Sequence, residues 1–332
     1  IERGMAPFFV FDGKSPIQKR AVVQKRRNDR QKAEQILSDH DHEDMKPEYR
    51  IKQMKKAFSI TQTDYVICQN ILDAMGFGWV IASGEADPLC AAIERAYPNL
   101  VSGVVSEDSD VLMYGADSLI TGFSGKEDNP MDTRTHLHTP IEFKRQHIKK
   151  YLLDKANEIR TKNQIPIIFE FTHEDFVNWG ILMGTDYMTE FETECHKKGI
   201  NKETLFEIFV LNNLDVELTI RKLFDSKTDG KSENPIVVQL IQKWKETCDL
   251  YLRCDVLNPK EINIKPRRPN VDKLLELLST IPLFPEELLM RIKKMNFYFD
   301  AFIQLSEASD KEYEGFKSYQ RKFLLKGAQG AK

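Results

Sequence analysis

Short apolar runs that end in acidic residues alternate with helical patterns in the N-terminal third of the chain, and this alternation most constrains the fold. Residues 7–11, 77–82 and 101–105 are apolar segments of strand length. Residues 61–75 and 88–97 have the apolar spacing of amphipathic helices. Alternating strands and helices predict an α/β fold with a mostly parallel central sheet flanked by helices. Toward the C-terminus the pattern is mainly helical.

Other elements follow from the same patterns. Residues 17–38 lack glycine and proline and predict a helix, and residues 46–58 predict a second one. This basic pair has few large apolar residues, so we expect it to stand off the core. Residues 165–171 predict a further strand, and residues 200–225 predict a helix.

Acidic residues follow three of the predicted strands. They are Asp12, Glu85, Asp87, Asp108 and Asp110. In an open α/β sheet, ligands bind beyond the carboxyl ends of the strands, so we expect these side chains to converge at one edge. So many carboxylates in one place are unfavourable unless cations neutralise them, and ligation by oxygen alone suits Mg²⁺ or Mn²⁺. Two such ions can activate a phosphodiester, and the predicted chemistry is metal-assisted hydrolysis.

Simpler interpretations remain for these residues. An Asp after a strand is often a turn former or an N-cap, and Glu85 and Asp87 could only favour the start of the following helix. The spacing of Asp108 and Asp110 is also found in the nucleophile motif of haloacid-dehalogenase-type phosphatases. That interpretation leaves Glu85 and Asp87 unexplained, whereas acidic doublets of equal spacing after two successive strands favour a metal site.

Opposed blocks of charge cancel along the chain, whose formal net charge is −3. Residues 14–56 carry 13 basic and 7 acidic side chains, a net of +6, and residues 64–132 carry 2 basic and 12 acidic ones, a net of −10. The basic block follows Asp12 directly. A run of charge is usually a solvated helix face. Beside an acidic metal site it also suits the attraction of phosphates, and this combination is typical of a nuclease.

Two further observations restrict the class of protein. No run of about 18 apolar residues occurs, so we expect no membrane span. The five cysteines are widely spaced without a C-x-x-C pair, which argues against a disulfide framework or a thiolate metal site and favours an intracellular protein.

Four motifs resemble those of the flap endonuclease/XPG family of structure-specific 5′ nucleases, in the family's order. They are Val10-Phe-Asp-Gly-Lys-Ser-Pro16, Ala82-Ser-Gly-Glu-Ala-Asp-Pro-Leu-Cys-Ala-Ala92, Ser106-Glu-Asp-Ser-Asp-Val-Leu-Met-Tyr-Gly115 and Ile181-Leu-Met-Gly-Thr-Asp-Tyr187. Together they cover roughly residues 5–190. The resemblance implies a PIN/5′-nuclease-like fold whose residues 14–58 form a helical arch.

The resemblance also implies roles for individual residues. Two Mg²⁺ ions, or Mn²⁺, would be bound by Asp12, Glu85, Asp87, Asp108, Asp110 and Asp186. Lys19 and Arg26 would grip the scissile phosphate, and with Asp12, Glu85, Asp108 and Asp110 they make up the predicted catalytic set. Nucleic acid would also be bound by Lys14, Arg20, Lys25, Arg27, Arg30, Lys197, Lys198 and Lys202.

The chain departs from the family pattern in two places. The family's first strand and its metal-binding Asp should precede Pro7, and we expect a truncation or a start-site artefact there. After Tyr187 the glycine-rich helix-turn-helix of the family is divergent and keeps one glycine, Gly199. These departures suggest a divergent, viral or otherwise specialised member.

These observations predict a nuclease core over residues 1–190, a helical DNA-binding region over 191–310 and a basic tail over 311–332. The predicted function is Mg²⁺-dependent 5′ nuclease action on branched or flapped DNA during replication, repair or recombination. The alternatives are an RNA-cleaving, host-shutoff-like relative and a non-catalytic XPG-like scaffold. The predicted partner is DNA, or RNA, without a membrane or a recognisable sliding-clamp peptide. We expect a monomer in the nucleus or at a viral replication site.

Overall fold

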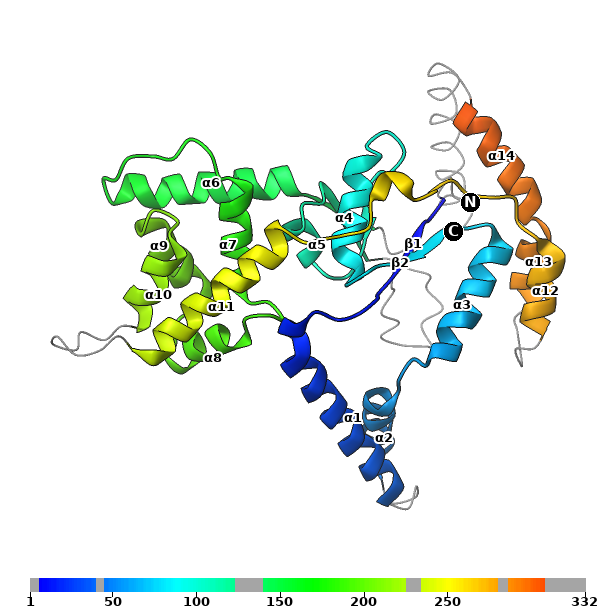
Figure 1. The fold of residues 1–332 in the computed structure, drawn as a ribbon, viewed down its shortest axis with the longest axis horizontal. Coiled ribbons are helices and arrows are strands. Elements are labelled where there is room, and N and C mark those ends of the chain that lie inside the picture. Colours follow the sequence, from blue (N-terminus) through cyan, green and yellow to red (C-terminus); the bar gives the residue numbers. More distant parts are fainter. Residues whose placement is uncertain (1–5, 40–44, 123–139, 225–233, 280–285, 308–332) are drawn as a thin grey trace, which may run out of the picture. The chain divides into compact units, whose positions relative to one another are not determined.

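The computed structural model of the protein describes residues 6–39, 45–122, 140–224, 234–279 and 286–307 (Figure 1). The predicted basic tail over 311–332 lies outside these residues. The chain divides into two compact units. Unit 1 comprises residues 1–9, 59–80 and 263–332, and unit 2 comprises residues 10–58 and 81–262.

Unit 2 contains a small sheet in the strand order β3-β4-β5. β3 (Val104–Val105) runs parallel to β4 (Ser118–Thr121), with Val104 opposite Leu119. β5 (Ile141–Lys144) runs antiparallel to β4 and was not predicted. β1 (Phe9–Phe11) and β2 (Trp79–Ile81) form a separate two-stranded sheet. The predicted α/β class with a small, mostly parallel sheet is confirmed.

Helices make up most of unit 2. The first group comprises α1 (Arg20–Asp39), which follows the 3₁₀ turn η1 (Ile17–Lys19), then α2 (Pro47–Ala57), α4 (Ala86–Ala96), α5 (Asp110–Met113), α6 (Arg145–Lys162) and α7 (His173–Met183). The second group comprises α8 (Thr189–Lys197), α9 (Lys202–Leu211), α10 (Val216–Phe224), α11 (Pro235–Leu252) and the 3₁₀ turn η2 (Pro259–Glu261). α1 and α2 pack against each other. The arch over residues 14–58 stays a prediction.

One apolar core joins α5, α7 and α11 with the helices around them. Val111, Val177 and Phe209 are fully buried within it. α7 begins with a capping box in which Thr172 and Asp175 satisfy each other's backbone amides. A Cβ added at Gly180 of α7 would lie 2.0 Å from the sulfur of Met113, so the absence of a side chain there makes room for Met113 of α5.

Two predicted elements of unit 2 differ from the structure. The predicted helix over 200–225 is two helices, because Asn213 and Leu214 have φ values of 58° and 61° and interrupt the helical hydrogen bonds. Residues 165–171 do not form a strand, because the side chains of α6 hold this segment in place of a neighbouring strand.

Unit 1 is helical and has its own small core of Ala74, Leu274 and Leu278. It contains α3 (Gln62–Met75), α12 (Val271–Ser279), α13 (Glu286–Lys293) and α14 (Met295–Glu307). α3 ends at Gly76, whose φ of 79° favours glycine and whose Cα lies close to the carbonyl of Arg267. Among the described helices of both units, none is long and apolar enough to cross a membrane.

Candidate active site

The ends of two strands and the starts of two helices place five acidic residues of unit 2. Asp12 follows β1, Glu85 is the N-cap residue of α4 and Asp87 lies in its first turn. Asp108 follows β3, and Asp110 begins α5. The Oδ1 atom of Asp12 accepts a hydrogen bond of 2.8 Å from the amide of Ala86, and Oδ1 of Asp108 accepts one of 2.9 Å from the amide of Asp110. Two of the carboxylates thus also fix the loops that carry the others.

Asp87 lies buried among the other carboxylates of the predicted site. Burial, followed by the negative charges of Asp108, Asp12, Glu85 and Asp110, raises the pKa of Asp87 to about 7. The acidic residues that follow three separate predicted strands are therefore near enough to Asp87 to act on its charge.

Asp110 has a smaller shift for a similar reason. Burial and the charge of Asp108 raise its pKa to about 6, whereas a hydrogen bond of 2.5 Å from the Tyr251 hydroxyl limits the shift. A protein that concentrates carboxylates in this way stabilises them with cations or with protons.

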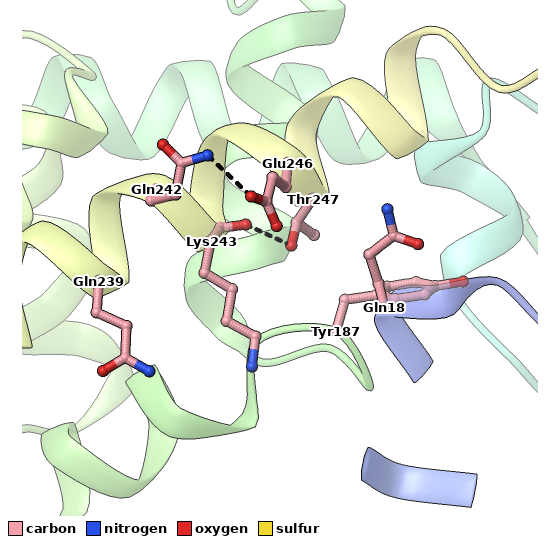
Figure 2. Close-up of a pocket in the computed structure, with 7 residues that line it drawn as sticks. All are labelled: Gln18, Tyr187, Gln239, Gln242, Lys243, Glu246 and Thr247. Carbon is pink, nitrogen blue, oxygen red and sulfur yellow. Dashed lines mark hydrogen bonds between the residues drawn. The ribbon is translucent and has the colours of Figure 1, made fainter. Parts of the chain in front are cut away.

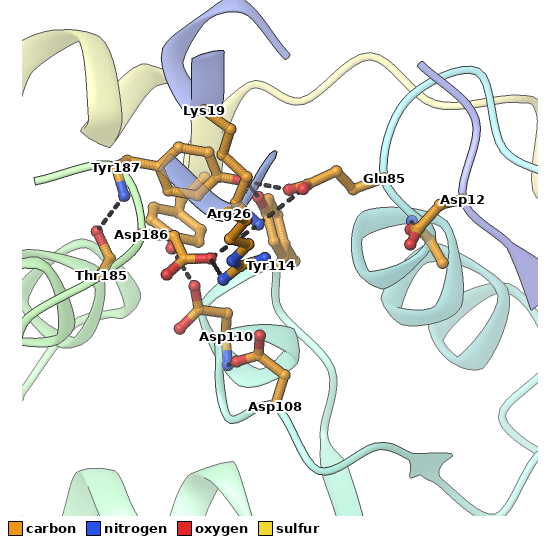
Figure 3. Close-up of polar contacts among 12 residues, drawn as sticks. Asp12, Lys19, Arg26, Glu85, Asp108, Asp110, Tyr114, Thr185, Asp186 and Tyr187 are labelled. Atoms are coloured by element: carbon orange, nitrogen blue, oxygen red, sulfur yellow. Dashed lines mark hydrogen bonds and ion pairs between the residues drawn. The ribbon is translucent and has the colours of Figure 1, made fainter. Parts of the chain in front are cut away.

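Two predicted phosphate-binding residues lie against these carboxylates (Figure 3). The Nζ atom of Lys19 is 2.7 Å from Glu85 and 3.7 Å from Asp186, and the guanidinium of Arg26 is 2.8 Å from Asp186. The side chain of Lys19 is 15% exposed, and that of Arg26 is 67% exposed. Asp186 therefore joins the other predicted site residues through its cationic partners.

The pKa of Lys19 reflects this contact. Burial lowers it, but the hydrogen bond to Glu85 and the charges of Glu85, Asp186 and Asp110 outweigh burial and raise it. Lys19 therefore keeps its positive charge in a half-buried position beside the acidic site.

Three tyrosines form a wall of the site that sequence reasoning did not predict. The Tyr187 hydroxyl donates a hydrogen bond to Glu85 and lies 3.0 Å from the Tyr114 hydroxyl. Lys19 lies over the Tyr187 ring, 4.9 Å from its centroid, and the Tyr114 and Tyr251 rings are 4.7 Å apart. Tyr187 and Tyr114 belong to the recognised motifs, so their position was a usable signal. Tyr251 had no such signal, since it reaches Asp110 across 141 residues of sequence.

The donor set fits divalent cations by its chemistry. It offers carboxylate oxygens alone, and the raised pKa values of Asp87 and Asp110 reflect a shortage of positive charge that Mg²⁺ would relieve. As the side chains lie, the described residues contain no group of three or more His, Cys, Asp or Glu drawn together around one point. Lys19 and Arg26 take up part of the negative charge instead.

The other predicted nucleic-acid contacts lie on the surface of unit 2. Lys14 before α1, Arg20 at its start, and Lys25 and Arg27 within it are exposed, and Arg30 is partly exposed on the same helix. In the second predicted group, Lys197 pairs with Glu194 at 2.6 Å, the Nζ atom of Lys198 donates to the Leu223 carbonyl, and Lys202 begins α9. Gly199 has a φ of 66° in the turn between α8 and α9.

A pocket of about 260 Å³ borders the site and was not predicted (Figure 2). It shares Tyr187 with the site, and its remaining lining comes from Gln18 beside Lys19 and from Gln239, Gln242, Lys243, Glu246 and Thr247 of α11. Gln242 donates to Glu246 at 2.8 Å, and Lys243 pairs with Glu190. Lys243 and Glu246 supply one charge of each sign, and carbon atoms of the lining side chains form most of the pocket surface.

Comparison with known proteins places the chain. Residues 76–186 match the family model of the XPG I-region. Over 289 residues the chain is 27% identical to mouse flap endonuclease 1 and 26% identical to that of Candida glabrata. The chain is thus similar to the flap endonuclease/XPG family, and the matched region includes Glu85, Asp87, Asp108, Asp110 and Asp186. Each alignment covers 86% of this chain and 65% of the relative, so the chain spans slightly less than two thirds of the length of those proteins.

Solved structures of similar fold support the architecture of the chain. The catalytic core of Rad2 in complex with a DNA substrate matches with a TM-score of 0.51 at 19% identity, covering 86% of this chain and 76% of that one. Flap endonuclease-1 from Methanococcus jannaschii matches with a TM-score of 0.50 at 18% identity, covering 90% of this chain and 76% of that one. The predicted PIN/5′-nuclease-like architecture is therefore confirmed.

Proposed function

We propose that the protein is a divalent-metal-dependent, structure-specific 5′ nuclease that hydrolyses phosphodiesters in branched DNA during replication, repair or recombination. The observation that carries the proposal is the contact of Lys19 with Glu85 and Asp186 inside a cluster of mutually repelling carboxylates. Such a site places positive side chains where a phosphate can take over their ion pairs. The match to the XPG I-region and the names of the relatives support the same activity.

Each group of residues has a separate task in this proposal. Two Mg²⁺ or Mn²⁺ ions, held by Asp12, Glu85, Asp87, Asp108, Asp110 and Asp186, would supply Lewis-acid activation of the phosphodiester. Lys19 and Arg26 exchange their carboxylate partners for the oxygens of the scissile phosphate.

The tyrosine wall positions these groups. The Tyr187 hydroxyl orients Glu85 while its ring supports Lys19, and Tyr251 orients Asp110. The predicted domains, 1–190 and 191–310, and the roles of the α1 and α8–α9 lysines and arginines stay proposals of the same kind.

Cleavage of a labelled 5′-flap DNA by the purified full-length protein tests this function. We expect cleavage with Mg²⁺ and none with EDTA. Asp108→Ala and Asp110→Ala should each lower the rate by about 10³-fold or more, because each removes negative charge that holds a divalent ion. Asp154→Asn, an exposed carboxylate of α6, is the matched control and should leave the rate unchanged.

Three outcomes separate the candidates. Cleavage of matched RNA in preference to DNA would replace the DNA nuclease by the RNA-cleaving alternative. Absence of cleavage on all branched substrates would favour the scaffold, although the retained carboxylates speak against it. Wild-type cleavage by the Asp108→Ala, Asp110→Ala double variant would refute the assignment of the site. Light scattering of the same sample tests the predicted monomer.

A further inference from the structure

A second basic surface of unit 2 lies on α6 and the segment that follows it (α6 is labelled in Figure 1). Here a groove of about 360 Å³ opens between Arg145, Lys149 and Lys150 on α6 and Phe169 and Phe171 of the following segment. The proposed nuclease site does not use any of these five residues.

The segment that carries Phe169 is fixed to α6 by side chains. The Asn157 amide donates to the carbonyl of Ile168 at 2.9 Å and accepts from its backbone amide at 2.8 Å. Arg160 donates to the carbonyl of Pro166 at 2.5 Å, and Phe171 is 2% exposed in the core. The backbone on both sides of Phe169 is therefore held in place.

This anchoring turns Phe169 outward. Its exposed fraction is 90%, and Ile167 beside it is 51% exposed, whereas Ile168 between them packs against the core. Burying a phenylalanine side chain is worth about 1.5–3 kcal/mol, so a fixed backbone that leaves one almost fully exposed forgoes that stabilisation. Single exposed apolar residues are common, but this one stands on an anchored segment beside unpaired cations.

The charges of the groove are mainly positive. Arg145 pairs with Asp117 at 2.5 Å, and its Nε atom is buried without an acceptor among the described residues. Lys149 and Lys150 have no carboxylate partner in the described part of the chain. Glu170 is the remaining acidic residue that lines the groove.

The pKa of the neighbouring His173 is lowered in part by the same positive charges. Burial, followed by the charges of Arg145, Lys149 and Arg95, lowers the pKa of His173 to about 4. The histidine therefore stays neutral at physiological pH, and its Nδ1 atom lies 3.3 Å from the Arg145 guanidinium.

We propose that this groove binds a single-stranded segment of nucleic acid, with one base stacked on Phe169 and adjacent phosphates on Lys149 and Lys150. Exposed aromatic rings beside lysines bind single strands in this way, because every unpaired base has a free face for stacking. A duplex offers no such face within its length. The inference rests on the proposed nuclease function, which brings nucleic acid to unit 2.

Binding measurements test the groove separately from catalysis. Fluorescence anisotropy of a labelled oligodeoxythymidylate is measured on the Asp108→Asn background, which prevents cleavage. Phe169→Ala should weaken binding by about 5- to 100-fold, and Phe169→Trp should restore it. Tyr151→Ala, an exposed aromatic of α6 that does not line the groove, is the control and should bind like the parent.

The contribution of Lys149 and Lys150 can be measured from the salt dependence of binding. Replacing both Lys149 and Lys150 by Gln should reduce the slope of log K against log salt concentration by about 1.4, since each phosphate contact on a single strand contributes about 0.7. Lys162→Gln at the end of α6 is the matched control and should leave the slope unchanged.

Two results would overturn the proposal in distinguishable ways. The groove would be rejected if Phe169→Ala and the double lysine variant both bind like the parent. Normal flap cleavage by the protein that keeps Asp108 would then show that the proposed nuclease function still holds. Failure of the parent protein to bind or cleave any nucleic acid would reject both. Loss of binding in Phe169→Ala without rescue by tryptophan would indicate a local structural defect and reject stacking.

Discussion

The acidic site and the α6 surface both bring cations to the surface of unit 2, but they surround them differently. At the acidic site Lys19 and Arg26 lie within ion-pair distance of Glu85 or Asp186. On α6 the lysines at 149 and 150 have no acidic partner among the described residues. Under the two proposals, the paired cations would hold one phosphate at one place, whereas the unpaired ones would follow a flexible strand. The acidic partners of the cations, more than the number of charges, distinguish the two regions.

Substitution of one lysine in each region should give the largest difference in cleavage rate between the two regions. Lys19→Met is expected to slow flap cleavage by about 10²-fold, because it removes a positioned charge at the reacting phosphate. Lys150→Met should change the rate less than about 3-fold at saturating substrate, because it acts on binding. Single-turnover rates of the two variants provide the measurement. Equal losses in both would show that the regions do not differ as described.

The dependence of stability on pH should also separate the two regions. The folded pKa values of Asp87 and Asp110, about 7 and about 6, lie above their values near 3.8 in the unfolded chain. Their contribution to stability is therefore complete below about pH 4 and is lost as the pH rises to about 7.

Thermal unfolding without divalent ions measures this effect. We expect a loss on the order of 6 kcal/mol between pH 4 and 7 from these two groups together. Asp87→Asn should flatten the profile, and Mg²⁺ should raise the melting temperature most at the high-pH end, because ligands must be deprotonated. The Asp154→Asn control on α6 should keep the parental profile. A parental profile in Asp87→Asn would contradict the mutual repulsion.

The smallest expected effect concerns the tyrosine wall. Tyr251→Phe removes the hydroxyl that donates to Asp110, so the pKa of Asp110 should rise further and the pH dependence should shift upward. The free energy of unfolding should fall by about 1 kcal/mol. Denaturant titration at several pH values would detect both changes. Tyr151→Phe on α6 is the matched control. An identical response in this variant would show that the changes do not come from the hydrogen bond between Tyr251 and Asp110.

The acidic site was predictable from sequence because its parts are local. Apolar runs mark strands, and acidic residues such as Asp12 and Asp108 follow them in the sequence. The expectation that these strands are neighbours was wrong, because β1 and β3 belong to separate sheets. The contact of Tyr251 with Asp110 was not predictable, because it depends on where α11 packs. The conformation of residues 165–171 was also not predictable, because their apolar run predicts a strand that does not form. Hydrogen bonds from Asn157 and Arg160, spaced along a helix, hold this segment instead.

The packing of Met113 against Gly180 joins the two helices that lead to opposite parts of the acidic site. Asp110 begins α5, and the segment with Asp186 follows the C-terminal end of α7. A Cβ at position 180 would lie 2.0 Å from the Met113 sulfur, so a larger residue there would force the Met113 side chain to move. A glycine outside the proposed set of site residues thus helps to determine how the helix that carries Asp110 packs against the helix that precedes Asp186.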